Sequence, residues 1–353
     1  MPLLTRMVTA PLIVDVRRGA FDELATVLAD QRISTAGRVA IVLGPHSGQR
    51  LRPRLEHQRL HADYFTVSAG TVDAAVDLVE AARRSTYDAI VGIGGGRVLD
   101  VTKFAAARLG LPMVAVATNL AHDGIGSPVA ILDNDRGRGS YGVPAPIAVL
   151  VDLDLVRQAP RASVAAGIGE ALSNLSAVAD WELAHEVTGE AIDGLAVTMS
   201  RTAARSLLHD PGDLDSDAFV ALLAEALVLS GLAMVVAGTS RPCSGACHEI
   251  SHAIDLLHPD RAGAHGEQVG VGAAFATWLR GDHELSATIV QVLRRHGLPV
   301  GPADLGFTDA EFVEILAFAP QTRPGRYTIL EHLDLDAAGI ADAVRGYASA
   351  IGC

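Results

Sequence analysis

Three consecutive glycines, Gly94, Gly95 and Gly96, stand between a short apolar run and a stretch with helical spacing. Residues 89–93 are typical of a buried strand, and residues 98–108 of an amphipathic helix. Glycines at such a turn let backbone N–H groups approach a phosphate at the helix N-terminus. The pattern is neither the GxGxxG fingerprint nor a Walker P-loop. An ordinary turn needs one or two glycines, so three in a row predict a nucleotide-binding turn.

Short β-branched runs alternate with helical stretches through the first half of the chain. The predicted strands are residues 12–16, 39–43, 64–67, 89–93 and 113–117, and the predicted helices are residues 21–29, 71–83 and 98–108. A further apolar run at residues 146–151 ends this half. Such alternation is typical of a parallel sheet wrapped by helices.

The pattern changes near Pro160, after which almost every apolar run has the length or spacing of a helix. We therefore expect an α/β nucleotide-binding domain over residues 1–160 and an all-α domain over residues 161–353. The length of 353 residues agrees with two domains, because single cores usually stop growing at roughly 250–300 residues. In two-domain enzymes of this type the active site usually lies at the junction.

Charge and cysteine content restrict the partners and the compartment. A formal net charge of −13 repels nucleic-acid phosphates and anionic lipid, so we expect a small-molecule substrate and no nucleic acid. Three cysteines are too few for a disulfide framework, which favours a reducing cytoplasm. The apolar segment 219–238 approaches the length of a membrane span, but it contains Glu225 and lacks a flanking basic cluster. We expect a buried helix there and no membrane insertion.

One carboxylate and two imidazoles in the second half form a candidate ligand set, Glu170, His248 and His265. This combination suits a divalent cation such as zinc, and three protein ligands leave a position open for a substrate oxygen. His252 follows His248 by four residues, so both side chains would face the same side of a helix.

Each histidine taken singly is more often a surface or hydrogen-bonded core residue than a ligand, and the cluster strengthens the assignment. A zinc site built from Cys243, Cys247 and His248 is the alternative. Its CxxxC spacing departs from the usual two-residue spacing, and no second cysteine pair is present.

Several segments resemble a known family. Residues 94–103 (GGGRVLDVTK) resemble the GGGxxxDxxK signature of the iron-containing alcohol dehydrogenase and dehydroquinate synthase-like superfamily. Residues 118–128 (TNLAHDGIGSP) resemble the TxxSHDGIxSP segment of sn-glycerol-1-phosphate dehydrogenases. Further matches follow in the family's order at residues 179–184 (ADWELA), 240–245 (SRPCSG), 251–255 (SHAID), 265–270 (HGEQVG) and 326–330 (RYTIL). The chain therefore resembles the sn-glycerol-1-phosphate dehydrogenase family over nearly its whole length.

This resemblance implies a dehydroquinate synthase-like fold, with a Rossmann-like N-terminal domain and an all-α metal-binding C-terminal domain. It implies interconversion of a small polyol phosphate and its ketone, like glycerol-1-phosphate and dihydroxyacetone phosphate, with NAD or NADP and a divalent metal. We expect zinc, with iron or nickel as alternatives. We also expect a cytoplasmic homo-oligomer. No acidic residue follows residues 39–43 in the stretch 44–48, so NADP stays open beside NAD.

The resemblance also implies roles for individual residues. Those implied to bind the cofactor are Gly94, Gly95, Gly96, Asp100, Lys103, Thr118 and Ser127. Metal binding is implied for Glu170, His248 and His265, and action on the substrate for Asp123 and His252. His252 would contact the substrate phosphate, transfer a proton or orient a metal ligand.

Three positions depart from the family pattern. The metal-binding aspartate of GxGD is Glu170 here, as in dehydroquinate synthases, and the other departures are Cys247 and Ala121. A longer carboxylate moves the metal or the helix by about one methylene. Together these changes suggest the hypothesis of a retuned pocket. The alternative activities are a sugar-phosphate cyclase of the dehydroquinate synthase type and a dehydrogenase for an unphosphorylated polyol.

Overall fold

The computed structural model describes residues 11–35, 37–135 and 137–352. Within these ranges the chain forms two compact units. The first, here called the sheet unit, comprises the described residues up to Asn119 together with Gly124–Ala159. The second, the helical unit, comprises Leu120–Asp123 and the described residues from Pro160 onward. Each is treated by itself.

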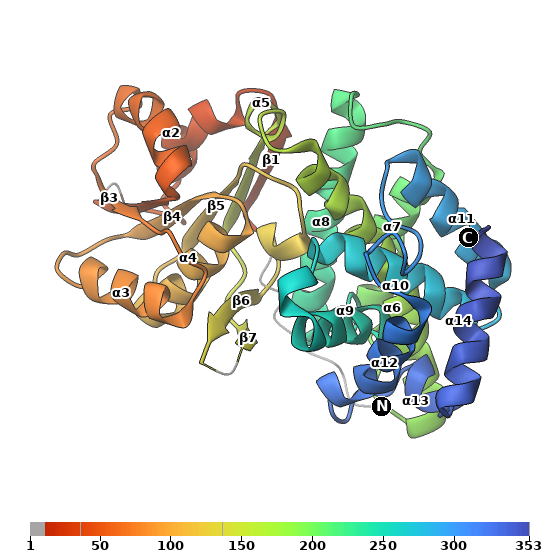
Figure 1. The fold of residues 1–353 in the computed structure, drawn as a ribbon. Coiled ribbons are helices and arrows are strands. Elements are labelled where there is room, and N and C mark those ends of the chain that lie inside the picture. The colour runs from red at the N-terminus through yellow and green to blue at the C-terminus, as the bar shows by residue number, and fades with distance from the viewer. Residues whose placement is uncertain (1–10, 36, 136, 353) are drawn as a thin grey trace. The chain divides into compact units, whose positions relative to one another are not determined.

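The sheet unit contains a six-stranded parallel sheet in the order β1-β8-β5-β4-β2-β3 (Figure 1). Its strands are β1 (Ile13–Arg17), β2 (Val39–Leu43), β3 (Ala62–Thr66), β4 (Ala89–Gly94), β5 (Met113–Ala117) and β8 (Ala148–Asp152). The four inner strands are buried along their whole length. Their continuous apolar runs are what a parallel sheet covered on both faces requires.

The predicted strands overlap the observed ones, with shifts of one or two residues at the two edge strands, at the end of β4 and at both ends of β8. Strand β3 begins at Ala62 rather than residue 64, and β1 runs from Ile13 to Arg17 rather than over residues 12–16. Both edge strands are only partly buried, and β3 includes Asp63, a poor strand former. Their bounds are fixed by pairing with the neighbouring strand, which sequence periodicity does not report.

Helices cover both faces of this sheet. Val91 and Ile93 of β4 share a hydrophobic cluster with Leu51 and Leu55 of α2 (Pro45–His57). The residue between them, Gly92, faces the other way, where an added Cβ would lie 2.9 Å from Thr102 Oγ1. That second face is covered by α4 (Gly96–Leu109), which packs on β4 and β5.

Several short elements of this half of the chain were not predicted from the sequence. They are helix α2, the antiparallel hairpin of β6 (Val129–Asn134) and β7 (Gly137–Gly142), and the short helices η2 (Asp123–Ile125) and α5 (Leu153–Val156). Helix α2 is polar and contains Pro53, and β7 is rich in glycine, so neither shows a clear period. The other helices are η1 (Ala20–Glu23), α1 (Leu24–Leu28) and α3 (Val72–Ala82).

The helical unit confirms the predicted all-α second half. Its main helices are α6 (Arg161–Thr188), α7 (Gly194–His209), α8 (Asp217–Ala237), α9 (Ala246–Leu257), α10 (His265–Leu279), α11 (His283–Arg295), α12 (Asp309–Phe318), α13 (Ile329–Leu333) and α14 (Ala337–Ile351). The short 3-10 turns are η3 (Pro259–Arg261) and η4 (Ala319–Thr322). Helix α6 is the longest, and α7, α8, α9 and α10 pack against it.

Helix α8 contains the apolar segment noted in the sequence. By length and composition alone, it is the one helix among the described residues that could cross a membrane. It packs against α6 and α7 instead, and 61% of its most apolar window is buried. A core helix meets the same criterion of length and hydropathy.

Helices α6 and α10 approach each other so closely that their backbones touch. A Cβ added at Gly169 would collide with the carbonyl oxygen of Gly266, and one at Gly266 with that of Ala166. Only glycine fits at such contacts. Two side chains next to these glycines, Glu170 and His265, are therefore held by a backbone contact that leaves little room for adjustment.

Candidate active site

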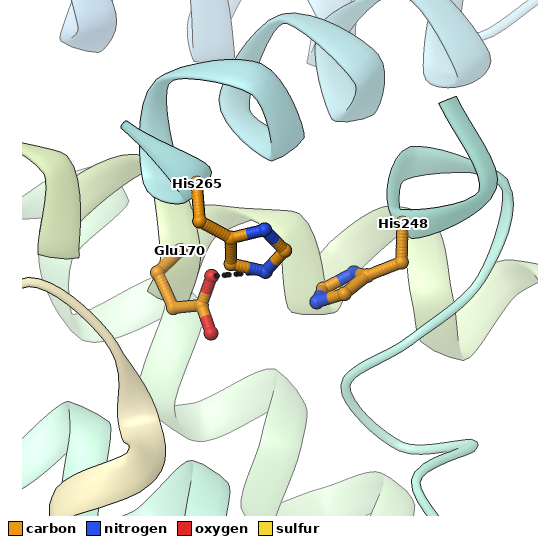
Figure 2. A group of neighbouring side chains, drawn as sticks. All are labelled: Glu170, His248 and His265. Atoms are coloured by element: carbon orange, nitrogen blue, oxygen red, sulfur yellow. Dashed lines mark ion pairs between the residues drawn. The ribbon is translucent and has the colours of Figure 1, made fainter. Parts of the chain in front are cut away.

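The side chains of Glu170, His248 and His265 converge within the helical unit (Figure 2). They come from three different helices, α6, α9 and α10. One potential ligand atom from each lies within 4.8 Å of the others, and His265 Nε2 is 3.5 Å from Glu170 Oε2. A carboxylate and two imidazoles at these separations can hold one divalent cation.

A buried carboxylate fixes the start of helix α9, which carries His248. Asp180 of α6 accepts a hydrogen bond of 2.8 Å from the Ala246 backbone N–H, the first residue of α9. It also accepts one of 2.8 Å from Ile329 at the start of α13, and it forms an ion pair with Arg280. Asp180 therefore links the first turns of α9 and α13 to α6. Because His248 lies in the first turn of α9, this link fixes its position.

A hydroxyl selects which nitrogen of His265 faces the cluster. Ser251 Oγ lies 2.6 Å from Gln268 Oε1, which can only accept, so the hydroxyl donates to Gln268. The same Oγ lies 3.0 Å from His265 Nδ1 and must then accept the Nδ1 proton. This arrangement leaves a lone pair on Nε2, the atom that faces Glu170, and such hydrogen bonds typically orient metal-binding histidines.

A thiol lies beside Nδ1 of His248, as the Ser251 hydroxyl lies beside Nδ1 of His265. Cys247 Sγ lies 3.4 Å from His248 Nδ1 and 3.7 Å from the Ser173 carbonyl oxygen, to which it donates. The sulfur can then accept a proton from Nδ1, which leaves Nε2 of His248 available to a cation. Burial raises the pKa of Cys247 to about 12, so it remains a neutral thiol. This departure from the family pattern thus has a local structural role.

The pKa shifts of Glu170 and His248, together with an unpartnered carboxylate oxygen, indicate that the cluster can bind a cation. Burial, followed by the nearby Asp123 carboxylate, raises the pKa of Glu170 well above its usual range. Burial, His265 and His252 lower the pKa of His248. Glu170 Oε2 is also buried without a hydrogen-bond partner, which is costly for a carboxylate. A divalent cation would supply the missing partner, so the residues present fit the expected metal.

Two residues assigned to the substrate lie at this cluster. The Asp123 backbone N–H donates a hydrogen bond to the Glu170 carboxylate. The negative charge of the Asp123 carboxylate also raises the pKa of Glu170. The His252 ring is 6.3 Å from the His248 ring, and its Nδ1 accepts a hydrogen bond of 3.4 Å from Arg323. Within the helical unit, the five residues predicted to bind metal or substrate are therefore brought together.

The glycine turn lies in the sheet unit, where β4 meets α4. A Cβ added at Gly94 would lie 2.8 Å from Val98 Cβ, so internal packing requires glycine there. At Gly95, the N-cap of α4, the closest atom would be Asn119 Cβ at 3.7 Å, an ordinary contact. The φ of Gly95 is −84°, which any residue adopts. Among the described residues, nothing requires glycine at position 95, whereas a phosphate approaching the helix N-terminus would.

Asp100 and Lys103 have a structural role in the same unit. Their side chains are buried and form an ion pair of 2.9 Å, and Lys103 also donates to the Val129 carbonyl at the start of β6. Thr118 directly follows β5, and Ser127 is buried just before β6. The assignment of these four residues to the cofactor stays a prediction.

Comparisons with known proteins identify the family. A family model described as iron-containing alcohol dehydrogenase matches residues 15–160. A glycerol-1-phosphate dehydrogenase (NAD(P)+) from Methanosarcina barkeri is 36% identical over 91% of this chain and 90% of its own length. One from Thermofilum pendens is 42% identical over 72% of this chain and 74% of its own. The chain belongs to the glycerol-1-phosphate dehydrogenase family.

Solved structures agree on the fold. The crystal structure of a probable glycerol dehydrogenase from Sinorhizobium meliloti 1021 covers 99% of both chains with a TM-score of 0.78 at 22% identity. The predicted family and fold class are therefore confirmed, and family membership makes the chain an oxidoreductase of the nicotinamide-dependent type.

Sequence reasoning missed several residues around the cluster. Asp180, Ser251 and Arg326 lie in segments that match the family, but no role was assigned to them. Gln268 also lies in such a segment, whereas Arg323 lies outside them. Their partners are distant in sequence, as in the contact between Asp180 and Ile329, so local spacing gives no signal of their function.

Proposed function

We propose that this protein catalyses the nicotinamide-dependent interconversion of sn-glycerol-1-phosphate and dihydroxyacetone phosphate. The observation that carries the proposal is the convergence of Glu170, His248 and His265 with an unpartnered buried carboxylate oxygen. The names of relatives matching over most of the chain supply the substrate. A divalent cation held at such a site can polarise a ketone.

The cofactor would be held at the glycine turn of the sheet unit. Gly94, Gly95 and Gly96 would place the pyrophosphate at the N-terminus of α4, with Thr118 and Ser127 along the ribose and nicotinamide. Because the stretch after β2, Gly44 to Gly48, contains no acidic residue to repel a 2′-phosphate, we propose that NADH and NADPH are both accepted.

Zinc is the cation proposed for the three ligands, with iron and nickel as the alternatives to be tested by metal analysis. When bound, a divalent cation supplies a Lewis acid that polarises the substrate oxygen. Side chains of the helical unit orient the ligands and balance the charge of the cation. Ser251 and Cys247 orient the two imidazoles, and Glu170 supplies the negative charge that a divalent cation requires.

Proton transfer accompanies the hydride. In the reducing direction the nicotinamide gives a hydride to the carbonyl carbon, and the carbonyl oxygen must gain one proton. Asp123, beside Glu170, would bind a substrate hydroxyl or relay this proton. His252 would supply the proton or contact the substrate phosphate. We also propose that the enzyme is a cytoplasmic homo-oligomer.

The test is a reduction assay on purified, metal-loaded protein with dihydroxyacetone phosphate, using NADH and NADPH in parallel. Unphosphorylated dihydroxyacetone and glycerol oxidation serve as comparisons. We expect the highest kcat/KM with the phosphorylated ketone. Preference for an unphosphorylated polyol, or release of inorganic phosphate from a sugar phosphate without net change in nicotinamide absorbance, would overturn the proposal in favour of a polyol dehydrogenase or a cyclase.

A further inference from the structure

Three arginines of the helical unit lie on two loops that meet. Arg241 is in the loop between α8 and α9, and Arg323 and Arg326 are in the loop between η4 and α13. Arg241 is buried, and the other two are half-buried. They differ in what binds their guanidinium groups: Arg241 forms an ion pair with Glu190, whereas Arg323 and Arg326 form none among the described residues.

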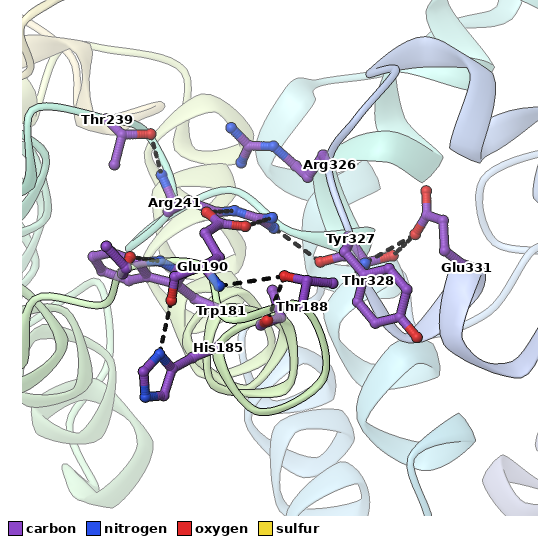
Figure 3. Close-up of polar contacts among 12 residues, drawn as sticks. Trp181, His185, Thr188, Glu190, Thr239, Arg241, Arg326, Tyr327, Thr328 and Glu331 are labelled. Atoms are coloured by element: carbon purple, nitrogen blue, oxygen red, sulfur yellow. Dashed lines mark hydrogen bonds and ion pairs between the residues drawn. The ribbon is translucent and has the colours of Figure 1, made fainter.

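Arg241 is compensated. Its Nε donates a hydrogen bond of 2.7 Å to Glu190 Oε1, its Nη2 pairs with the other oxygen of that carboxylate, and its Nη1 donates to the Tyr327 carbonyl at 2.9 Å (Figure 3). A bidentate pair of this kind is specific and strong. Arg241 therefore anchors the loop that contains Arg326 and Tyr327.

Arg323 and Arg326 bind only neutral groups. Arg323 Nη1 and Arg326 Nη2 both donate to Ser240 Oγ, at 3.2 Å and 3.0 Å. Arg326 Nη1 also donates to the Ser244 carbonyl, and Arg323 Nε to His252 Nδ1. In the part of the chain that the structure describes, neither guanidinium forms an ion pair with a carboxylate.

Two cations that share one hydroxyl repel each other, and burial strengthens the repulsion. The effect is visible in the pKa of Arg326, which burial and the neighbouring Arg323 lower to about 10. An anion between the two guanidinium groups would remove this cost. Of these three arginines, Arg241 is the one that forms an ion pair with a carboxylate within the described residues.

Hydroxyl groups next to the two arginines complete a set of donors. Ser240 Oγ accepts from both guanidinium groups and retains its own proton to donate. Ser244 Oγ is buried and has no hydrogen-bond partner, although its backbone carbonyl already binds Arg326. The two guanidinium groups can only donate, and each hydroxyl still has a proton to donate, which is the chemistry that recognises a phosphate.

This donor set lies beside the candidate metal ligands. His252 links the two, because its ring is 6.3 Å from that of His248 and its Nδ1 binds Arg323. In a phosphorylated ketone only a short linkage separates the carbonyl from the phosphate, so a single molecule can reach both groups.

We propose that Arg323 and Arg326, together with Ser240 and Ser244, bind the phosphate group of the substrate. This inference rests on the proposed function, and it names the residues that distinguish a phosphorylated from an unphosphorylated ketone. Arg241 positions the loop and does not touch the phosphate. The 2′-phosphate of NADPH is another group with the same chemistry. A comparison of NADPH with NADH distinguishes it from the substrate phosphate.

The kinetic test uses Arg326→Gln and Arg323→Gln, with Arg345→Gln as control. Arg345 is exposed on α14 and pairs with Asp342, so its replacement removes the same charge away from the site. We expect KM for dihydroxyacetone phosphate to rise roughly ten- to hundredfold in the first two variants, because each loses a charged hydrogen bond. Activity on unphosphorylated dihydroxyacetone should fall much less than activity on the phosphorylated ketone, because it has no phosphate to bind, and Arg326→Lys should restore part of the affinity.

Equal losses on both ketones, or an increase confined to KM for NADPH relative to NADH, would overturn the proposal. The second outcome would place the 2′-phosphate at these arginines instead.

A binding measurement separates this inference from the proposed function. Calorimetric titration of the metal-loaded protein with inorganic phosphate needs no turnover. We expect binding by the wild type and by Arg345→Gln, and at least tenfold weaker binding by Arg326→Gln. If the wild type binds phosphate in this way but does not reduce dihydroxyacetone phosphate, the proposed function fails and the anion site stands. If Arg326→Gln binds phosphate as tightly as the wild type, the anion site fails.

Discussion

The Ser251 hydroxyl lies 3.0 Å from Nδ1 of His265 and thereby fixes which ring nitrogen faces Glu170. Its own proton goes to Gln268, so the hydroxyl can only accept from the imidazole. Neither Ser251 nor Gln268 is among the three candidate ligands. The orientation of the site therefore depends on residues that a list of ligands omits.

Ser251→Ala should weaken metal binding without unfolding the protein. Loss of a hydrogen bond that orients a ligand typically lowers metal affinity by about 10–100-fold. The measurement is competition with a chromogenic chelator, accompanied by thermal unfolding of the metal-free form. Ser286→Ala, on α11, is a suitable control, because this buried hydroxyl binds the Ala274 carbonyl instead of a candidate ligand. Unchanged metal affinity in Ser251→Ala would contradict the assigned tautomer of His265.

Gly95→Ala should weaken nicotinamide binding at least tenfold while leaving stability almost unchanged. The new Cβ would meet only Asn119 at 3.7 Å, so the free energy of unfolding should change by less than about 1 kcal/mol. Gly95→Val should have a larger effect on binding. Fluorescence titration with NADH and chemical denaturation are the two measurements.

Gly94→Ala provides the matched comparison at the neighbouring position. Its Cβ would lie 2.8 Å from Val98 Cβ, so overpacking should cost about 1–3 kcal/mol of stability. If Gly95→Ala destabilised the protein as much as Gly94→Ala, or bound NADH with wild-type affinity, the pyrophosphate would not lie on this turn.

Glu170→Asp should lower metal affinity by tenfold or more. The substitution withdraws the carboxylate by one methylene, and the contact between Gly169 and Gly266 prevents α6 from moving towards α10 to compensate. Metal content and activity on dihydroxyacetone phosphate should fall together. Higher activity of Glu170→Asp on this substrate would favour the hypothesis of a pocket retuned away from the family's usual ketone.

Acid should destabilise the helical unit partly through His296, which stacks on Phe219 with ring centroids 4.9 Å apart. Burial, followed by Arg295, lowers the pKa of His296 from 6.5 to about 4. Between these two values the unfolded chain binds the proton and the folded chain does not, so stability falls as pH drops from about 6.5 to about 4. His296→Gln should flatten this part of the curve in denaturant titrations at successive pH values. The same slope in both proteins would rule out His296 as the group responsible.

The sequence predicted the fold wherever its periodicity was strong. Strands β2 and β5 have the predicted bounds, because buried parallel strands are continuous apolar runs between turns. Helix α2 and the hairpin of β6 and β7 were missed, because a polar helix containing Pro53 and a glycine-rich strand have no such pattern.

The candidate ligands could be found from the sequence because their residue types and motifs are distinctive. The groups that orient and anchor these ligands could not be found from the sequence. Asp180 contacts Ala246 and Ile329, which are 66 and 149 residues away in the chain. Arg323 and Arg326 meet Ser240 from 83 and 86 residues away. Such relationships arise only from tertiary packing.

The central claim is that Glu170, His248 and His265 hold a cation on which catalysis depends. The most direct measurement is activity on dihydroxyacetone phosphate as the metal-stripped enzyme is titrated with zinc, with bound metal determined at each point. We predict that activity is absent at first and rises in proportion to bound metal up to one ion per chain. His265→Ala should bind little metal and stay inactive while its metal-free form unfolds like the metal-free wild type. Full activity of the stripped enzyme, or full metal and activity in His265→Ala, would contradict the account.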